Sequence, residues 1–375
     1  MLKAMGFPSR YIQGPGALNH AGPLLGELGF KCPVVLCDDT VRKVALPSLL
    51  DSLERAGHPS SVVIFPGEIN HDTVAQCNQQ VADFAPDVVV GLGGGKAVDA
   101  AKAAAAQLDV PVVIAPTVAS NDAPTSRLIV INDQNSTPTQ IDFLKLNPMA
   151  ILVDTEIIVN APARFFAAGI GDAISKSLEA HQCAASGGEN FFGTPPSATA
   201  VMLADQCYNV ILTHAVSAYD DVKNHKVSRE VEELVEATVL LSGLGFESGG
   251  LSLAHALIRG ITAIPSMGKN LHGEMVAFGA LVQTVIEDRP QQVLDQLIAI
   301  LAYTNLPTTF ADLGYEGDVK PADLDQMIAA TLAHKYATNM TPTLTGPRLK
   351  DALIKTNKLG TSLRGRNAQP LELPQ

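Results

Sequence analysis

The sequence predicts an α/β fold, a doubly wound parallel sheet with an inserted hairpin, followed by an all-α part. Up to about Ala161, short β-rich runs alternate with helical segments, which is typical of strand–helix–strand units around a parallel sheet. After VNAPARFF (159–166), apolar residues recur at helical spacing. A chain of 375 residues is also long enough for two cores. We therefore expect two domains, residues 1–161 and 162–375.

The first domain is expected to consist of β-branched runs separated by helices. Strands are expected at Val34–Asp39, Ser61–Phe65, Asp87–Gly93, Pro111–Pro116 and Ala150–Thr155. Helices are expected at Leu46–Ala56, His71–Phe84 and the alanine-rich segment Ala97–Ala106. Residues 127–146 predict the inserted hairpin. In the second domain, helices are expected at Phe165–Ala185, Pro196–Tyr219, Ser228–Leu244, Leu251–Ala263, Glu274–Glu287 and Gln291–Tyr303, and Ser362–Gln375 is expected to be loosely packed.

The composition excludes several classes of partner. Acidic residues outnumber basic ones, 38 to 26, which gives a net charge of -12. Such a chain does not attract nucleic-acid phosphates or an anionic membrane surface, so we expect neither as a partner. No apolar run is long enough to span a bilayer or to act as a signal peptide. The five cysteines form no C-x-x-C pair, which favours a reducing cytoplasm over a disulfide framework.

The stretch DVVVGLGGGKAVDAAKAAAA (87–106) joins a buried strand to a helix through three glycines. Gly93, Gly94 and Gly95 let the backbone turn sharply and let a ligand approach. The N–H groups at the start of the following helix favour an anion, so a phosphate is the expected ligand, with Lys96 adding charge. The stretch matches neither G-x-G-x-x-G nor the Walker A pattern. A tight turn without a ligand is the alternative.

Two further polar features follow predicted strands. The loop APTVASNDAPTS (115–126) begins at the carboxyl end of a strand, the edge at which open α/β sheets bind ligands. It offers the hydroxyls of Thr117 and Ser120 and the carboxylate of Asp122; alternatively it is a polar turn with Asx-type hydrogen bonds. Asp38 ends an earlier strand, where a carboxylate can bind ribose hydroxyls or can be a solvated turn residue.

Three residues of the helical half form a candidate metal site. Asp172, near the expected start of a helix, His255 and His272 are ligand types that suit Zn²⁺ and leave a fourth coordination place open. Each also has a structural explanation: Asp172 and His272 as helix caps, His255 as a core histidine. His181 is the best rival ligand.

Taken together, these stretches resemble the glycerol dehydrogenases, within the metal-dependent, or iron-containing, alcohol dehydrogenases of dehydroquinate synthase-like fold. The stretches that carry the resemblance occur in the expected order between Arg10 and about Gly279. They are RYIQGPGAL, GLGGGKAVDAAKA, APTVASNDAPTS, LVDTEII, NAPARFFAAGIGDA, LLSGLGFESGGLSLAHA and LHGEMVAFG. The resemblance implies an NAD-linked, zinc-dependent dehydrogenase that forms a homo-oligomer, with a nucleotide-binding first domain and a metal-binding second domain.

The resemblance also assigns roles to individual residues. It implies that Asp172, His255 and His272 hold the metal, Asp38 binds the adenosine ribose, and Asp122 hydrogen-bonds the substrate. The remaining cofactor contacts that it implies comprise the pyrophosphate loop, a second nucleotide contact and the nicotinamide side. They are Gly95, Lys96, Ala97, Val98 and Asp99, which continue the turn of Gly93 and Gly94 described above; Thr117, Val118, Ala119 and Ser120; and Ser126 and Leu128.

The sequence departs from this family pattern at positions that bear on the metal and the substrate. Where iron-type relatives carry a further His, four residues after the Asp, this chain has Lys176, which leaves three protein ligands and favours zinc. Lys176 resembles relatives that reduce 2-oxo acids, and a solvent-facing lysine is the alternative. Asn132 replaces a common Tyr, and HKYATNMTPT (334–343) replaces another family segment.

The resulting hypothesis is oxidation of glycerol or another small vicinal diol by hydride transfer to NAD⁺, in a cleft between the domains. The metal would lower the pKa of a substrate hydroxyl, and Asp122 would orient the substrate. Lys176 keeps a hydroxycarboxylate dehydrogenase open as the near alternative. A dehydroquinate-synthase-like lyase is a further alternative, although the Glu metal ligand of such lyases is absent here. A non-catalytic nucleotide-binding protein is the remaining alternative. Asp38 favours NAD over NADP because its charge would repel a 2′-phosphate.

Overall fold

The fold was analysed in a computed structural model that describes residues 2–133 and 138–364. The chain divides into two compact units. The sheet unit contains residues 6–163 and 221–239, and the helical unit contains residues 2–5, 164–220 and 240–364. Within the described residues, none of the helices has the length and apolar character needed to cross a membrane.

The sheet unit has a six-stranded parallel sheet in the order β1-β8-β5-β4-β2-β3, so the predicted fold class is confirmed. Its elements, in chain order, are β1 (Arg10–Gly14), η1 (Ala17–His20), α1 (Ala21–Glu27), β2 (Pro33–Asp38), α2 (Val41–Val44), α3 (Leu46–Arg55), β3 (Ser61–Phe65), α4 (His71–Ala82), β4 (Val88–Gly93), α5 (Gly95–Leu108), β5 (Val112–Pro116), β6 (Leu128–Asn132), β7 (Pro138–Phe143), β8 (Ala150–Asp154), α6 (Thr155–Asn160) and α10 (Arg229–Glu236). Strand β1 is the one described strand of this sheet that the sequence did not predict.

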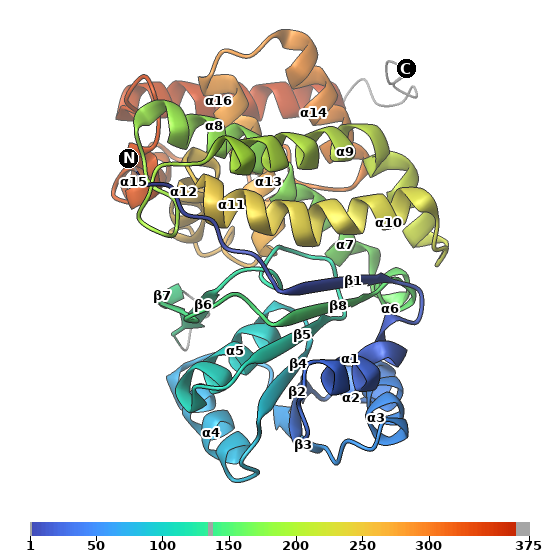
Figure 1. Cartoon of the computed structure of the whole chain (residues 1–375). Helices are drawn as coiled ribbons and strands as arrows, with labels where there is room; N and C mark the ends of the chain where they lie inside the picture. The colour runs from blue at the N-terminus through green and yellow to red at the C-terminus, as the bar shows by residue number, and fades with distance from the viewer. Residues whose placement is uncertain (1, 134–137, 365–375) are drawn as a thin grey trace. The chain divides into compact units, whose positions relative to one another are not determined.

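Helices cover both faces of the sheet, which explains why its strands read as continuous apolar runs. Alternate residues of one strand belong to opposite cores: Val34 and Leu36 of β2 pack with α4 and α5, whereas Val35 and Cys37 pack with α1 and α3. Figure 1 shows these two helix pairs on opposite sides of the sheet. Strands β6 and β7 form the predicted antiparallel hairpin; residues 134–137 of that prediction lie outside the described residues.

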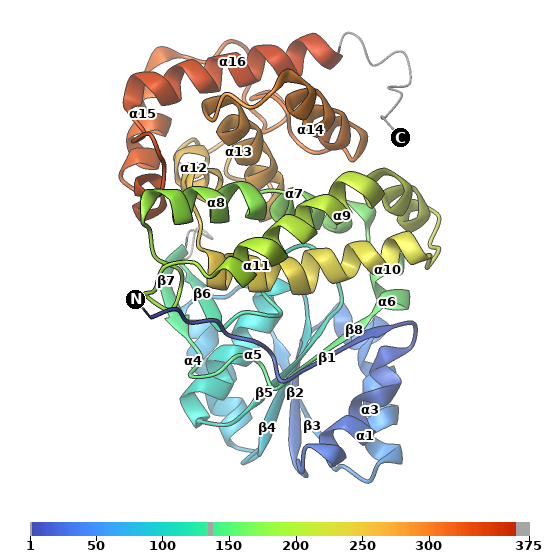
Figure 2. The same ribbon diagram turned by 45° about the horizontal axis from the view of Figure 1, so that its top comes forward.

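The helical unit consists of helices, and two of them, residues 198–223 and 237–241, each extend by three residues into the sheet unit. Its elements are α7 (Ala163–Ala173), α8 (Lys176–Ser186), α9 (Ala198–Lys223), η2 (Ala237–Leu241, a π-helix), α11 (Ser242–Gly249), α12 (Leu253–Thr262), α13 (His272–Ile286), α14 (Gln291–Tyr303), α15 (Pro321–Leu332), η3 (Lys335–Thr338) and α16 (Gly346–Arg364). Figure 2 shows α12 beside α13 within this unit. The sequence did not predict α15 or α16, and most of the expected loose end, 365–375, lies outside the described residues.

Two predicted helices differ from the structure. The expected helix Phe165–Ala185 is interrupted by a turn at Ile174 and Ser175, so Asp172 lies at the end of α7 rather than near a helix start. The expected helix Ser228–Leu244 is α10 followed by the π-helical η2 and α11, which continues to Gly249. Neither change is marked by a proline in the sequence.

Residues 221–239 belong to the sheet unit although the sequence placed them with the later helices. Glu232 of α10 explains this assignment: Gln13 Nε2 of β1 donates to its carboxylate at 2.7 Å, and Thr155 Oγ1 donates to it at 2.6 Å. Tyr11 donates to Gln13 at 2.6 Å. Burial, with help from Glu236 and Glu232, raises the pKa of Tyr11.

Candidate active site

Asp172, His255 and His272 form a cluster that could hold a metal ion. One ligand atom from each lies within 4.8 Å of the others. Oδ1 of Asp172 is 3.4 Å from Nε2 of His255 and 3.7 Å from Nε2 of His272. The structure therefore brings together the three predicted metal ligands, which lie in α7, α12 and α13.

Glycines beside these residues allow the three helices to approach closely. A Cβ on Gly273 would lie 1.8 Å from the carbonyl oxygen of Ala168, so α7 and α13 could not pack this way with any other residue. A Cβ on Gly279 would lie 2.4 Å from the carbonyl oxygen of Ala254, where α12 meets α13. Gly273 is next to His272, and Ala254 is next to His255. Close packing of the backbones therefore fixes the Cα positions of both histidines.

The carboxylate of Asp172 is fully buried and has one unusual partner. Lys176, the first residue of α8, donates from Nζ to Asp172 Oδ1 at 2.6 Å. Burial opposes ionisation of Asp172, but Lys176 and then His255 outweigh it and hold its pKa below the usual range. Lys176 is 2% exposed, so the alternative of a solvent-facing lysine is wrong for this side chain.

Glu179 was not predicted as a site residue, yet it determines how His255 is held. Its Oε2 lies 2.5 Å from Nδ1 of His255, and its Oε1 accepts the backbone N–H groups of His255 and Ser252 at 3.0 and 2.9 Å. A hydrogen on Nδ1 leaves Nε2 as the lone-pair nitrogen, the form that ligates a metal. The signal in the sequence was the spacing Asp172–Lys176–Glu179, three polar residues recurring at helical intervals in an apolar stretch.

The cluster fits a divalent metal ion on two grounds. Among the described residues, Asp172 Oδ2 is a buried oxygen with no hydrogen-bond partner, and a buried carboxylate oxygen without a partner is costly unless a cation takes it. One carboxylate and two imidazoles are also a donor set that suits zinc and other borderline divalent ions. His181, the rival ligand, lies elsewhere: it is half-exposed and pairs with Asp205 at 2.9 Å.

The predicted nucleotide-binding residues of the sheet unit gather at the carboxyl edge of the sheet. Asp38 ends β2, Gly93 ends the neighbouring β4, and Thr117 follows β5 and donates its N–H to the carbonyl of Gly93 at 3.1 Å. Asp38 Oδ1 accepts the N–H groups of Thr40 and Val41 at 2.8 and 2.9 Å, and its Oδ2 points toward Gly93. This edge is the ligand-binding edge of open α/β sheets.

The glycine turn leaves room that side chains would fill. Gly93 has a φ of 154°, and a Cβ there would lie 2.7 Å from Cβ of Ala97. A Cβ on Gly95 would lie 3.0 Å from Asn121 Nδ2 in the 117–126 loop. Gly94 is the N-cap of α5 and has no side chain to accept the first N–H groups. The start of α5 therefore offers backbone donors to an anion.

Several side chains of the predicted pyrophosphate loop are committed elsewhere. Lys96 donates to the carboxylate of Glu68 at 2.7 Å on the surface. Ala97 and Val98 pack into the core. Asp99 accepts the N–H of Val130 at 3.3 Å, and burial, opposed by Lys102, raises its pKa to about 6. In this segment, contact with a cofactor would have to come from the backbone.

The loop after β5 carries the remaining predicted contacts. Val118 and Ser120 are half-buried, Ala119 and Asp122 are buried, and Leu128 begins β6. The hydroxyl of Ser126 is buried and, among the described residues, has no hydrogen-bond partner, which is consistent with a ligand at this place. Lys102 holds the loop by donating to the carbonyls of Ala123 and Leu128 at 2.6 and 2.9 Å.

Besides Lys176, the departures from the family pattern are at Asn132 and in residues 334–343. Asn132, at the end of β6, donates its backbone N–H to the carbonyl of Ile69 at 3.0 Å, whereas its side-chain Oδ1 is buried and has no hydrogen-bond partner among the described residues. In the replaced segment, His334 caps η3, and Asn339 donates to the carbonyl of Leu251 at 2.8 Å, just before α12.

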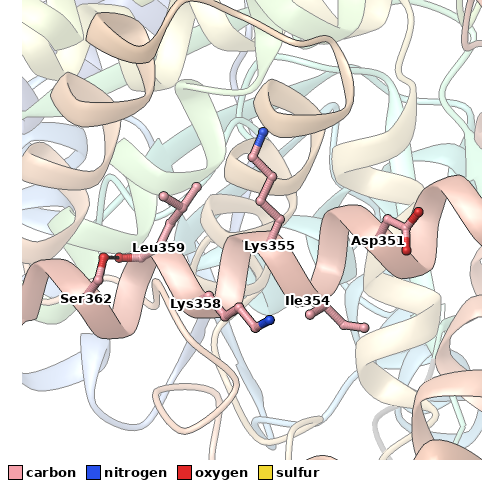
Figure 3. Close-up of a pocket in the computed structure, with 6 residues that line it drawn as sticks. All are labelled: Asp351, Ile354, Lys355, Lys358, Leu359 and Ser362. Atoms are coloured by element: carbon pink, nitrogen blue, oxygen red, sulfur yellow. Dashed lines mark hydrogen bonds between the residues drawn. The ribbon is translucent and has the colours of Figure 1, made fainter.

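A surface pocket on α16 contains none of the predicted site residues. It is lined by side chains of this one helix: Asp351, Ile354, Lys355, Lys358, Leu359 and Ser362. Figure 3 shows these side chains spread along the helix rather than converging on one point. We therefore place the candidate chemistry in the Asp172 cluster and at the carboxyl edge of the sheet.

Comparison with known proteins identifies the family. The model of a family described as iron-containing alcohol dehydrogenase matches residues 8–155. A glycerol dehydrogenase of Thermotoga maritima is 41% identical over 83% of this chain and 85% of its own length. A glycolaldehyde reductase of Halobacterium salinarum is 34% identical over 96% and 98%. The crystal structure of a glycerol dehydrogenase from Schizosaccharomyces pombe superposes with a TM-score of 0.92 at 33% identity, covering 100% of this chain and 95% of that one.

These similarities extend over nearly the whole chain and include both units. They confirm the resemblance drawn from the quoted stretches, including the predicted activity class. The chain belongs to the iron-containing alcohol dehydrogenase family and is an oxidoreductase of this NAD-linked, metal-dependent group.

Proposed function

We propose that this chain oxidises glycerol or another small vicinal diol to the hydroxyketone, with NAD⁺ as hydride acceptor and zinc as its metal. The observation that carries the proposal is the cluster of Asp172, His255 and His272, with a buried carboxylate oxygen that has no protein partner among the described residues. The relatives support the substrate class, because glycerol and glycolaldehyde both carry oxygen on adjacent carbons.

The choice of zinc rests on the number of protein ligands. A bound zinc ion supplies Lewis-acid polarisation of an alcohol oxygen and lowers its pKa. Asp172, His255 and His272 would hold it and leave one coordination place open. Glu179 keeps Nε2 of His255 in the ligating form, and the position that would carry a fourth imidazole is Lys176.

For the cofactor, the chain's own groups bind and orient rather than react. The Gly93–Gly95 turn and the first N–H groups of α5 would bind the pyrophosphate. Asp38 Oδ2 would accept a ribose hydroxyl and repel a 2′-phosphate, which favours NAD over NADP. Ser126 and Asp122 would orient the nicotinamide and the substrate, respectively, since correct positioning lowers the barrier as effectively as polarisation does.

A reductase of 2-oxo acids is the second candidate, and Lys176 is the observation that favours it. A buried ammonium could hold a substrate carboxylate. In the structure, however, this ammonium already donates to the carboxylate of Asp172 at 2.6 Å. The diol is the better supported substrate because the similar proteins of Thermotoga maritima and Schizosaccharomyces pombe are glycerol dehydrogenases.

A substrate panel on metal-stripped protein tests the proposal. The protein is treated with a chelator, supplied with Zn²⁺ or Fe²⁺, and assayed for NADH production with glycerol, propanediol and butanediol, and for NADH consumption with 2-oxobutanoate. We expect zinc-dependent turnover of the diols. Faster turnover of the 2-oxo acid would replace the diol by the second candidate, and preference for iron would refute the choice of zinc.

Two histidine variants connect that activity to the cluster. His272→Ala should abolish zinc-dependent turnover while leaving the fold intact, because the side chain is 46% exposed. His181→Ala is the matched control, since this half-exposed histidine pairs with Asp205 outside the cluster. Equal activity of both variants would contradict the proposed site.

We also propose a cytoplasmic location and a homo-oligomeric state. The cysteines are free thiols, and four of the five are buried, which fits a reducing compartment. Ile141, Phe143 and Leu146 on and after β7 are 40%, 44% and 75% exposed, an apolar surface of the kind that subunit contacts cover. Light scattering of the purified protein would measure the number of subunits; a monomer would contradict the proposal.

A further inference from the structure

Lys176 lies among the atoms that would hold the metal. Its Nζ is 2.6 Å from Asp172 Oδ1 and 3.3 Å from His255 Nε2, so it contacts two of the three candidate ligands at the atoms that would bind the ion. It is 2% exposed, and its Nζ lies 5.6 Å from the centre of the Phe246 ring. The ammonium is therefore a cation built into the site itself.

The ammonium and a metal ion cannot use Asp172 Oδ1 in the same way. Zinc binds carboxylate oxygen and imidazole nitrogen at about 2.0–2.2 Å, within the space that an ammonium 2.6 Å from the same oxygen already occupies. An ammonium and a divalent metal ion that bind the same buried carboxylate would also repel each other strongly. The ammonium also lies 3.3 Å from Nε2 of His255. A metal ion bound to that nitrogen and to either oxygen of Asp172 therefore requires Lys176 Nζ to move away from these ligand atoms.

Lys176 has the opposite effect on the metal-free protein. Asp172 is fully buried, and a buried carboxylate that loses its charge partner destabilises a fold strongly. Lys176, four residues after Asp172 in the chain, forms this ion pair. It supplies the positive charge that the site needs when no metal is present.

We propose that Lys176 is an internal competitor of the metal: its ammonium stabilises the metal-free site and lowers the affinity for the divalent ion. This inference rests on the proposed metal ligands Asp172, His255 and His272. It adds that the chain exchanges one cation for another at this place. The metal-free protein would therefore stay folded, and the fraction of protein with a bound metal ion would depend on the concentration of free metal.

The test compares wild-type protein with Lys176→Met, which keeps most of the length of the side chain and removes the charge. Chelator-stripped protein is titrated with Zn²⁺ against a chromophoric chelator at one fixed pH, and Tm is measured with and without zinc. We expect Lys176→Met to bind zinc at least about tenfold more tightly, about 1.4 kcal/mol. We also expect it to have a lower Tm than wild type when metal-free, and a larger increase in Tm on zinc binding.

Lys350→Met is the control, because this lysine of the helical unit forms an exposed ion pair with Asp325 at 3.1 Å. It should match wild type in both measurements. A Lys176→Met protein that folds only when zinc is present would support the proposal. Unchanged or weaker zinc affinity in a folded Lys176→Met protein would overturn it.

The inference and the proposed function can fail separately. If wild type binds zinc and oxidises diols but Lys176→Met binds zinc no more tightly, only the competitor role is wrong. If neither wild type nor Lys176→Met binds zinc, the proposed metal site and the competitor role are both wrong.

Discussion

Glu179→Gln should weaken metal binding although Glu179 is not a ligand. Oε1 of Glu179 accepts two backbone N–H groups, from His255 and Ser252. Only an oxygen can do so, and the glutamine must therefore place its NH₂ group at the Oε2 position. That NH₂ faces Nδ1 of His255, which becomes an acceptor and moves the ring hydrogen to Nε2.

A hydrogen on Nε2 blocks the atom that should bind the metal. Loss of a carboxylate partner to a metal-binding histidine typically costs 10- to 100-fold in metal affinity, which corresponds to about 1.4 to 2.7 kcal/mol. We expect a loss of metal affinity in this range for Glu179→Gln. No larger loss is expected, because the glutamine keeps the contact with Ser175 Oγ, which is 2.9 Å from Oε2 in the wild type.

The assay is competition for Zn²⁺ against a chromophoric chelator, with circular dichroism to verify folding. Asp205→Asn is a matched control, because it alters a carboxylate–histidine pair at the surface, with His181 at 2.9 Å; exposed pairs contribute little. A folded Glu179→Gln protein with wild-type zinc affinity would refute the assignment of His255 Nε2 as a ligand atom.

Three further predictions concern the sheet unit. Gly94→Ala should leave stability almost unchanged, since its Cβ would meet only Val118 at an ordinary 3.5 Å, but should weaken NAD⁺ binding measured by fluorescence titration; unchanged affinity would exclude close approach of the pyrophosphate. Asp38→Ser, which retains a capping oxygen but no charge, should raise kcat/KM for NADP⁺ relative to NAD⁺; a constant ratio would argue against a ribose contact. Burial, opposed by Lys102, raises the pKa of Asp99 from 3.8 to about 6. The folded protein therefore keeps a proton that the unfolded chain loses, and stability falls by up to about 3 kcal/mol as pH rises through this range; urea unfolding of Asp99→Asn should lack this fall.

Much of the fold followed from local patterns. The β-branched runs around Val34, Val88 and Val112 marked buried strands correctly because parallel strands are apolar on both faces. The short strand β1, Arg10–Gly14, was not predicted because RYIQG has no such run. Pairing with β8 stabilises it as a strand. The assignment of residues 221–239 to the sheet unit depends on long-range contacts to Glu232, which no local pattern records.

The candidate site was predictable in its ligand types but not in its surroundings. Asp172, His255 and His272 were predicted from their residue types and from the resemblance, and the structure brings them together. The roles of Lys176 and Glu179 depend on a turn that interrupts the expected helix and on the position of α12. A single sequence cannot give the distance from a lysine nitrogen to a histidine nitrogen on another helix. Only the structure places the ammonium of Lys176 among the candidate ligand atoms.

Anomalous diffraction at the zinc absorption edge, from crystals grown with Zn²⁺, tests the central claim most directly. The account predicts one strong peak bonded by the carboxylate of Asp172, Nε2 of His255 and Nε2 of His272, with Lys176 Nζ displaced from Asp172 Oδ1. No peak at these three residues, or zinc bound instead at a site such as His181 and Asp205, would contradict it.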